Sequence, residues 1–167
     1  ELNLRLVITD DQTGAAEAIQ QGLSRAGITV TIQPLDENAY SSEVTAGDGS
    51  GYDLVLSSWQ PDVPSPNANL TPLFHSSQIG GGNYNLARFD DPEVDEAILE
   101  ASSTVDPEEA HTLWAAVDKQ ILEQSPVVPL IYSKNSFLHG SGVENFVIGE
   151  FPAYPNYLIT SIGGFAF

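Results

Sequence analysis

A tryptophan and an aspartate stand three residues apart in a loop that three prolines stiffen. The stretch SSWQPDVPSPNAN, residues 57–69, follows the apolar run YDLVL and contains Trp59, Gln60 and Asp62. Proline lowers the conformational entropy of the unbound loop, so less entropy is lost when a ligand binds. An aspartate beside an indole wall suits a primary ammonium group. The stretch therefore predicts a site for an amine-bearing ligand.

The same residues also have a purely structural interpretation. Trp59 could plug the end of the preceding strand, and Asp62 could cap a turn, as aspartate often does in proline-rich loops. The residues taken alone leave both interpretations open.

No other group of residues predicts catalysis or metal binding. The sequence has no cysteine, no GxSxG or Walker motif and no GxGxxG behind a strand, and its three histidines lack metal-ligand spacing. Adjacent carboxylates occur where helices are expected to start, and free N–H groups favour them there. These are Asp10 and Asp11, Asp90 and Asp91, and Glu108 and Glu109. We therefore expect no enzyme activity, no metal site and no cofactor.

The charge balance is strongly acidic. The 167 residues include 23 Asp and Glu against 5 Lys and Arg, a formal net charge of −18 at pH 7. Such a surface repels phosphate backbones and anionic lipids, so nucleic-acid and membrane-surface partners are disfavoured. It is typical of a solvated surface on a secreted protein, and a field that attracts cationic ligands is the alternative. The sequence has no apolar run long enough to span a membrane and no signal-peptide pattern.

Strand and helix periods alternate through the first part of the chain. Residues 2–9 and 28–32 alternate apolar and polar side chains, as strands do. The helix between them has an apolar face formed by Ala15, Ile19, Leu23 and Ala26. This order predicts a βαβ unit with parallel strands. A short helix at 36–46 capped by Asp36, a turn at 47–51 and an apolar inner strand at 52–58 are expected next.

Two further helices have clear start signals. Asp91 and Asp106 each precede a proline and are expected to be N-caps. The first helix has a face of Val94, Ile98 and Ala101, and the second has a stripe of Ala110, Leu113, Trp114, Val117 and Ile121. That spacing makes Trp114 a core residue rather than a ligand platform.

The last part of the chain has weaker signals. We expect the second helix to end before Pro126, and a strand at 127–133 in which Pro129 marks an edge or a bulge. One more short strand is expected within 143–148. Together the elements predict an α/β domain with a mainly parallel sheet flanked by helices. Ligands bind such sheets beyond the carboxyl ends of strands, which is where the loop starting at Trp59 lies.

Three longer stretches carry spaced patterns of residues. Residues 15–32 form a helix with a leucine near its end, followed by a GI-V strand, and residues 51–62 match YD-----W--D. Residues 83–132 resemble the pattern N-----DPEVD-LL--A----DPEER--LY---Q-IL-E--P-IPLY. In this order they resemble the C-terminal lobe of the dipeptide/oligopeptide-binding family, the extracellular solute-binding proteins of peptide ABC transporters (bacterial solute-binding protein family 5).

The resemblance implies one lobe of a periplasmic-binding-protein-like (type II) fold. Residues 1–167 would form a single α/β lobe of a longer, two-lobed protein, and roughly the last 25–30 residues would return toward the other lobe. The part outside this chain would hold the signal peptide, any lipid-anchoring cysteine and the other half of the cleft.

The resemblance also assigns the site. The family's W--D aspartate, here Asp62, pairs with the N-terminal ammonium of an extended peptide, and Trp59 and Gln60 would flank the ligand. This chain departs from the family where Ser65 replaces a second aspartate and Val63 replaces a common aromatic.

The resulting functional hypothesis is a monomeric binding lobe for peptides or another amine-bearing solute. Its partner would be an ABC-transporter membrane permease. Its location would be extracellular or periplasmic, with lipid anchoring through a missing N-terminal segment. The alternative is a regulatory or structural cell-envelope lipoprotein domain that does not feed a transporter. An open polar cleft around Asp62 favours the first hypothesis, and a loop collapsed over Asp62 favours the second.

Overall fold

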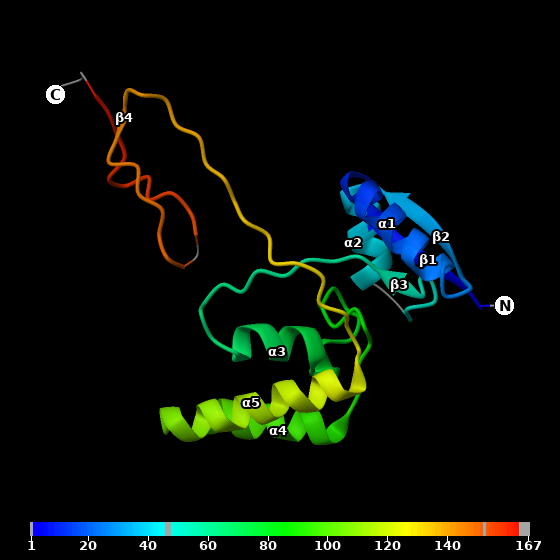
Figure 1. Ribbon diagram of the computed structural model, residues 1–167. Coiled ribbons are helices and arrows are strands. Elements are labelled where there is room, and N and C mark those ends of the chain that lie inside the picture. The colour runs from blue at the N-terminus through cyan, green and yellow to red at the C-terminus, as the bar shows by residue number, and fades with distance from the viewer. Residues whose placement is uncertain (1, 46–47, 152, 164–167) are drawn as a thin grey trace.

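The chain is arranged as an α/β unit, a helical unit and an extended C-terminal arm (Figure 1). The structure is a computed structural model that describes residues 2–45, 48–151 and 153–163. The α/β unit ends with β3, the helical unit runs from α3 to α5, and the C-terminal arm comprises residues 126–163.

The sheet of the α/β unit has the order β2-β1-β3, with every neighbouring pair parallel. β1 (Leu2–Thr9) pairs along its whole length with β2 (Ile28–Leu35), and α1 (Thr13–Ser24) connects the two strands. The predicted βαβ unit is confirmed. The first core cluster lies between this sheet and α1, and its buried members are Leu6, Ile8, Ala16 and Val30.

The predicted apolar face of α1 is partly wrong. Ile19 and Leu23 pack on the sheet, but the buried alanine is Ala16, whereas Ala15 and Ala26 are exposed. The helix ends at Ser24, so Ala26 lies beyond its last turn. The inward stripe therefore follows positions 16, 19 and 23.

β3 (Leu54–Val55) is much shorter than the strand predicted at 52–58. Its ladder is extended at each end by one bond, from Asp53 N–H to Arg5 O at 3.0 Å and from Leu56 N–H to Val7 O at 3.1 Å. No other described strand pairs with β3, so the backbone is free to leave the sheet after Leu56.

α2 (Glu37–Thr45) is the helix predicted at 36–46, and its cap is confirmed. The Asp36 carboxylate accepts hydrogen bonds from the backbone N–H groups of Asn38 and Ala39 at 3.1 and 3.0 Å. The predicted end of this helix at Ala46 and start of the following turn at Gly47 lie outside the described residues.

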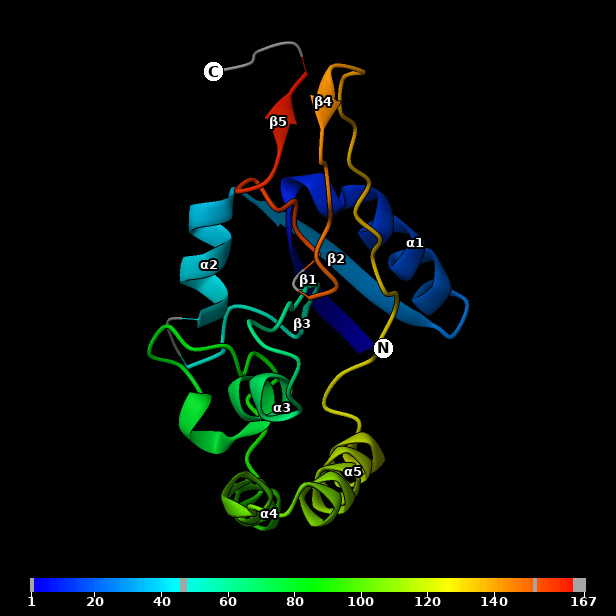
Figure 2. The ribbon, with the colours of Figure 1, turned by 90° about the vertical axis from the view of Figure 1, so that its left-hand side faces the viewer.

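The helical unit contains the two predicted helices and one that the sequence did not predict. α4 (Pro92–Ser103) and α5 (Pro107–Gln124) lie side by side beneath α3 (Asn67–Phe74) (Figures 1 and 2). Asp91 and Asp106 cap α4 and α5 through backbone N–H groups, as predicted. The second core cluster joins the three helices, and its buried residues are Leu70, Phe74, Val94, Ile98, Ala101, Trp114, Val117 and Ile121. Trp114 is therefore a core residue.

The loop between α3 and α4 is organised around Asn85, the buried polar residue of the described chain. Its Nδ2 donates to the carbonyl oxygens of His75 and Phe89 at 3.1 and 2.8 Å, and its Oδ1 accepts from Phe89 N–H at 2.9 Å. A loop backbone without regular pairing must satisfy its polar groups elsewhere, and one asparagine does so for three of them.

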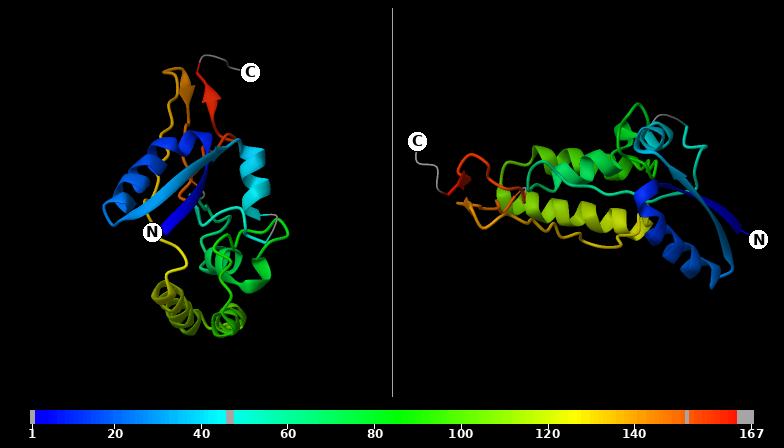
Figure 3. Two further views of the ribbon diagram at one scale, coloured as in Figure 1. Left: turned by 90° about the vertical axis from the view of Figure 1, so that its right-hand side faces the viewer. Right: turned by 90° about the horizontal axis from the view of Figure 1, so that it is seen from above.

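The C-terminal arm is extended and has little regular pairing. β4 (Val143–Glu144) and β5 (Ser161–Ile162) form a small antiparallel hairpin far from the first sheet (Figures 1 and 3). β4 confirms the short strand predicted within 143–148. The strand predicted at 127–133 is wrong, because this stretch has no strand pairing with any described segment, and Tyr132 is fully exposed.

Replacing Asn85 should destabilise the helical unit. Asn85→Ala leaves one N–H and two carbonyl groups without their partner, and an unsatisfied buried polar group costs about 1–3 kcal/mol. We expect a loss of that size in the free energy of unfolding, measured by urea denaturation. Asn38→Ala, at an exposed position in α2, is the control and should change little. Equal stability of the two variants would contradict the role of Asn85.

The Asp91 cap should make stability depend on pH in the acid range. The side-chain amide of Gln124 and the N–H groups of Glu93 and Val94 donate to the carboxylate and lower the pKa of Asp91. Because the folded-state pKa lies below the unfolded one, this stabilisation is present above the ordinary aspartate pKa of about 4 and is lost as pH falls through the folded-state value.

Asp91→Asn tests this dependence, because asparagine can still cap the helix without the charge. Thermal unfolding should show the variant less stable than the wild type near pH 7, with the gap closing below about pH 4. Asp90→Asn is the matched neighbour and should track the wild type. A gap that stays constant across this range would contradict the prediction.

Candidate functional site

The proline loop, defined here as residues 57–66, leaves the carboxyl end of β3 and leads to α3 (Figure 1). Two tyrosines fix the segment that carries it. The Tyr40 hydroxyl donates to Leu56 O at 2.9 Å, directly before the loop, and the Tyr52 hydroxyl donates to Leu86 O at 2.7 Å. Burial raises the pKa of both tyrosines, so both hydroxyls stay protonated donors at neutral pH. The loop therefore starts from a fixed point at the sheet end, where ligands of such sheets bind.

Trp59 connects the proline loop to α3 and is half-buried. Its Nε1–H donates to the carbonyl oxygen of Ala68 at 3.1 Å. The helical partner of that carbonyl would be the N–H of residue 72, but Pro72 has none. The indole thus supplies the donor that the helix lacks. Its ring also packs on Tyr84, with ring centroids 5.1 Å apart at an interplanar angle of 58°.

Asp62 is exposed at the tip of the proline loop. Within the described part of the chain, its carboxylate accepts no hydrogen bond and forms no ion pair. The local turns close through backbone bonds instead, from Ser65 N–H to Val63 O at 2.8 Å and from Ala68 N–H to Ser65 O at 3.1 Å. The interpretation of Asp62 as a turn cap therefore has no hydrogen bond to support it.

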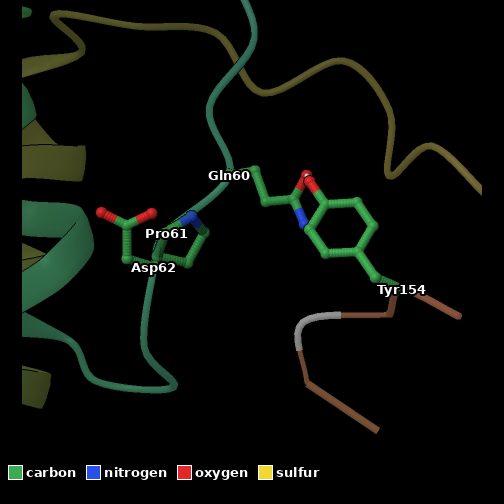
Figure 4. Close-up of a pocket in the computed structure, with 4 residues that line it drawn as sticks. All are labelled: Gln60, Pro61, Asp62 and Tyr154. Carbon is green, nitrogen blue, oxygen red and sulfur yellow. The ribbon is translucent and has the colours of Figure 1, made fainter. Parts of the chain in front are cut away.

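Gln60 forms a hydrogen bond with a residue that the sequence did not predict as part of the site. The Tyr154 hydroxyl, from the C-terminal arm 94 residues further along, donates to Gln60 Oε1 at 3.3 Å. Gln60, Pro61, Asp62 and Tyr154 line a small open cavity of about 110 Å³ (Figure 4). In Figure 4 the Gln60 side chain points toward the Tyr154 ring, whereas the Asp62 carboxylate points to the other side of Pro61. Nothing in the local sequence around Tyr154 identifies it as a site residue.

The other candidate chemistries do not assemble into a site. Among the residues that the structure describes, no group of three or more His, Cys, Asp or Glu side chains is placed to hold a metal ion. The adjacent carboxylate pairs lie at helix starts as predicted. His75 is half-buried, and its Nδ1 accepts the N–H of Ser77 at 3.1 Å.

Comparison with known proteins identifies the family. The model of the bacterial extracellular solute-binding proteins, family 5 Middle, matches residues 7–81, which include the end of β1, the strands β2 and β3, the proline loop and α3. The glutathione-binding protein GsiB of Escherichia coli (strain K12) is 29% identical over 132 residues, 77% of this chain. The structure of clavulanic acid biosynthesis oligopeptide binding protein 2 is 30% identical, with a TM-score of 0.84 over 96% of this chain. Together these matches support a fragment of a family 5 solute-binding protein.

Within the family 5 proteins, the fold is the type II periplasmic-binding-protein fold expected from the sequence. The Helicobacter pylori periplasmic binding protein DppA, solved in complex with peptide STSA, matches with a TM-score of 0.70 over 77% of this chain at 22% identity. The chain spans 26% of the length of GsiB and 31% of the oligopeptide binding protein, so it corresponds to a part of these relatives. No helix in the described part of the chain is long and apolar enough to cross a membrane.

The bond between Trp59 and Ala68 can be tested through stability. Trp59→Phe keeps a ring against Tyr84 but removes the indole donor, and a typical hydrogen bond contributes about 0.5–1.5 kcal/mol. We expect a loss in that range in the free energy of unfolding by urea. In a Pro72→Ala background, residue 72 regains an N–H for the Ala68 carbonyl, so Trp59→Phe should there cost less. Equal losses in the two backgrounds would show that the indole does not replace the missing helical donor.

Proposed function

We propose that the chain is the ligand-binding lobe of an extracellular binding protein that captures peptides or another amine-bearing solute for import by an ABC transporter. The observation that carries the proposal is the Asp62 carboxylate. It is exposed beyond the carboxyl end of a parallel strand, beside a small cavity, and it has no protein partner among the described residues. A charge held on a proline-stiffened loop and left unpaired is suited to a cationic ligand.

The chemistry of the loop supports an extended peptide. Between Ser57 and Pro61 the backbone has no regular secondary structure, so its N–H and C=O groups can pair with a ligand as an added strand. Trp59, held on Ala68 and Tyr84, gives this segment a rigid apolar flank. An ammonium on Asp62 would then fix the amino end of the ligand, and the loop backbone would fix its direction.

The names of the relatives agree with a peptidic ligand. GsiB is named for glutathione, and DppA is described with a bound peptide. The oligopeptide binding protein covers nearly the whole of this chain. These relatives are about three times as long as this chain, so a second lobe would supply the other wall of the cleft.

The C-terminal arm supports the existence of further protein around this chain. It leaves large apolar side chains in water, among them Ile131, Tyr132 and Leu138, with relative exposures of 87%, 100% and 101%. Exposed apolar surface of this extent is typical of a contact with another part of a protein. Residues 1–167 as one lobe, with the arm returning toward the other, account for it. A monomeric protein outside the membrane, lipid-anchored through a segment before this chain and docking on a permease, completes the proposal.

The alternative, a regulatory or structural envelope domain without a ligand, has less support. A proline loop collapsed over Asp62, or a cleft filled by side chains, would favour this alternative. Asp62 is instead exposed and borders a cavity. An enzymatic function has no support either, because the adjacent carboxylates lie at helix starts.

Neutralising Asp62 should weaken binding much more than it changes stability. A charge-assisted hydrogen bond contributes about 1.5–3 kcal/mol, and leaving one partner buried alone costs about 2–5 kcal/mol. In the full-length protein, Asp62→Asn should weaken a free-amino peptide by roughly tenfold to a thousandfold in calorimetry. The melting temperature should stay close to that of the wild type. Asp118→Asn, on the exposed face of α5, is the control.

Acetylation of the peptide's amino group separates direct pairing from an indirect effect. It should weaken binding to the wild type by a similar factor, and should add much less loss in Asp62→Asn, because both changes delete the same pair. Losses that simply multiply would refute direct pairing. A variant that binds normally but is about 1 kcal/mol less stable would identify Asp62 as a structural cap.

A further inference from the structure

We propose that Tyr154 is a positioning residue of the binding site, which holds the Gln60 amide as a hydrogen-bond donor toward an acceptor oxygen of the ligand. The inference rests on the proposed function and adds a second recognition point to it. It follows from the contact between the C-terminal arm and the proline loop, two segments that are distant in sequence.

Tyr154 is placed by backbone bonds rather than by a core. Residues Ile148 and Pro155 form an isolated antiparallel bridge. Beside it, Gly149 N–H donates to Tyr154 O at 3.1 Å, and Asn156 N–H donates to Val147 O at 2.8 Å. The tyrosine therefore lies beside this bridge in the arm, and its ring forms one wall of the cavity beside Gln60 (Figure 4).

The direction of the hydrogen bond between Tyr154 and Gln60 determines which ligand group Gln60 can recognise. The Tyr154 hydroxyl donates to Oε1 of the Gln60 amide, and this orients the amide so that its Nε2 carries the free donors. Within the described residues Nε2 donates to no other group. A neutral amide donor of this kind matches a carbonyl or carboxylate oxygen. Without the tyrosine, the amide could rotate and present either its donor or its acceptor end.

The position of Gln60 relative to Asp62 restricts the class of ligand. Pro61 confines the preceding residue to an extended backbone, which advances about 3.1–3.3 Å per residue. Gln60 and Asp62 thus stand roughly 6–7 Å apart along the chain, and their side chains diverge around Pro61 (Figure 4). In a free amino acid a single carbon separates the ammonium from the carboxylate. One such molecule therefore cannot contact the Asp62 carboxylate and the Gln60 amide at the same time. A peptide of at least two residues can.

The test is a double-mutant cycle on the full-length protein with trialanine as the probe. Calorimetry would compare the wild type, Tyr154→Phe, Gln60→Ala and the double variant. Tyr154→Phe keeps the ring and removes only the hydroxyl. It should weaken trialanine roughly threefold to tenfold, as expected for the loss of one neutral hydrogen bond, and should add nothing in the Gln60→Ala background. Tyr157→Phe is the matched control, because Tyr157 lies on the same segment and is mostly exposed.

The outcomes separate this inference from the proposed function. Unchanged affinity in Tyr154→Phe, or losses that multiply in the double variant, would overturn the positioning role while peptide binding stands. Free alanine bound as tightly as trialanine would overturn the two-point recognition. A wild type that binds neither trialanine nor any other free-amino peptide of two or three small residues would overturn the proposed function itself.

Discussion

The geometry of the site depends on one backbone carbonyl group that lacks its hydrogen-bond partner within the helix. Pro72 lies inside α3, where it removes an N–H and crowds the carbonyl of Ala68, four residues earlier. A half-buried carbonyl without a donor is costly, and the indole N–H of Trp59 satisfies it. One proline in a helix therefore determines where the tryptophan of the preceding loop must lie. The position of Trp59 in turn places Gln60 and Asp62, since both follow it in a segment that Pro61 stiffens.

This arrangement explains why a very short strand is sufficient to carry the site. β3 pairs with β1 over two residues only, which by itself would hold the proline loop weakly. The Tyr40 hydroxyl binds the carbonyl of Leu56 directly after the strand, and the hydroxyl of Tyr52, just before the strand, binds the carbonyl of Leu86. Trp59 fixes the loop to α3. The loop is thus attached at both ends, to the sheet and to the helical unit. Between these attachments, Gln60 and Asp62 remain exposed and can meet a ligand.

The parts that the sequence predicted well are those in which local chemistry decides the structure. Asp36, Asp91 and Asp106 cap their helices because the side chain and the N–H groups it accepts from are two or three residues apart. The βαβ unit follows from the spacing of apolar residues in each segment and from the segment lengths alone. The same local logic fails at α3, whose first residues belong to the stretch 57–69 that the sequence predicted as a loop. The core contacts of Leu70 and Phe74 and the donor from Trp59 stabilise a helix there all the same. It fails also at 127–133, because a strand needs a partner that a pattern cannot supply.

Tyr154 shows the limit of sequence reasoning most clearly. The W--D spacing draws attention to Trp59, Gln60 and Asp62, which lie within four residues of one another. Tyr154 joins them only because the arm returns over the proline loop, and the bridge between Ile148 and Pro155 then aims its side chain. A contact across 94 residues must offset a large loss of chain entropy, and one hydrogen bond between exposed side chains contributes too little for that. In the proposed two-lobed protein, the exposed apolar side chains of the arm would supply further contacts that hold it. On this argument the Tyr154–Gln60 bond is a consequence of how the arm is held, and its value to the protein lies in orienting Gln60 rather than in stabilising the fold.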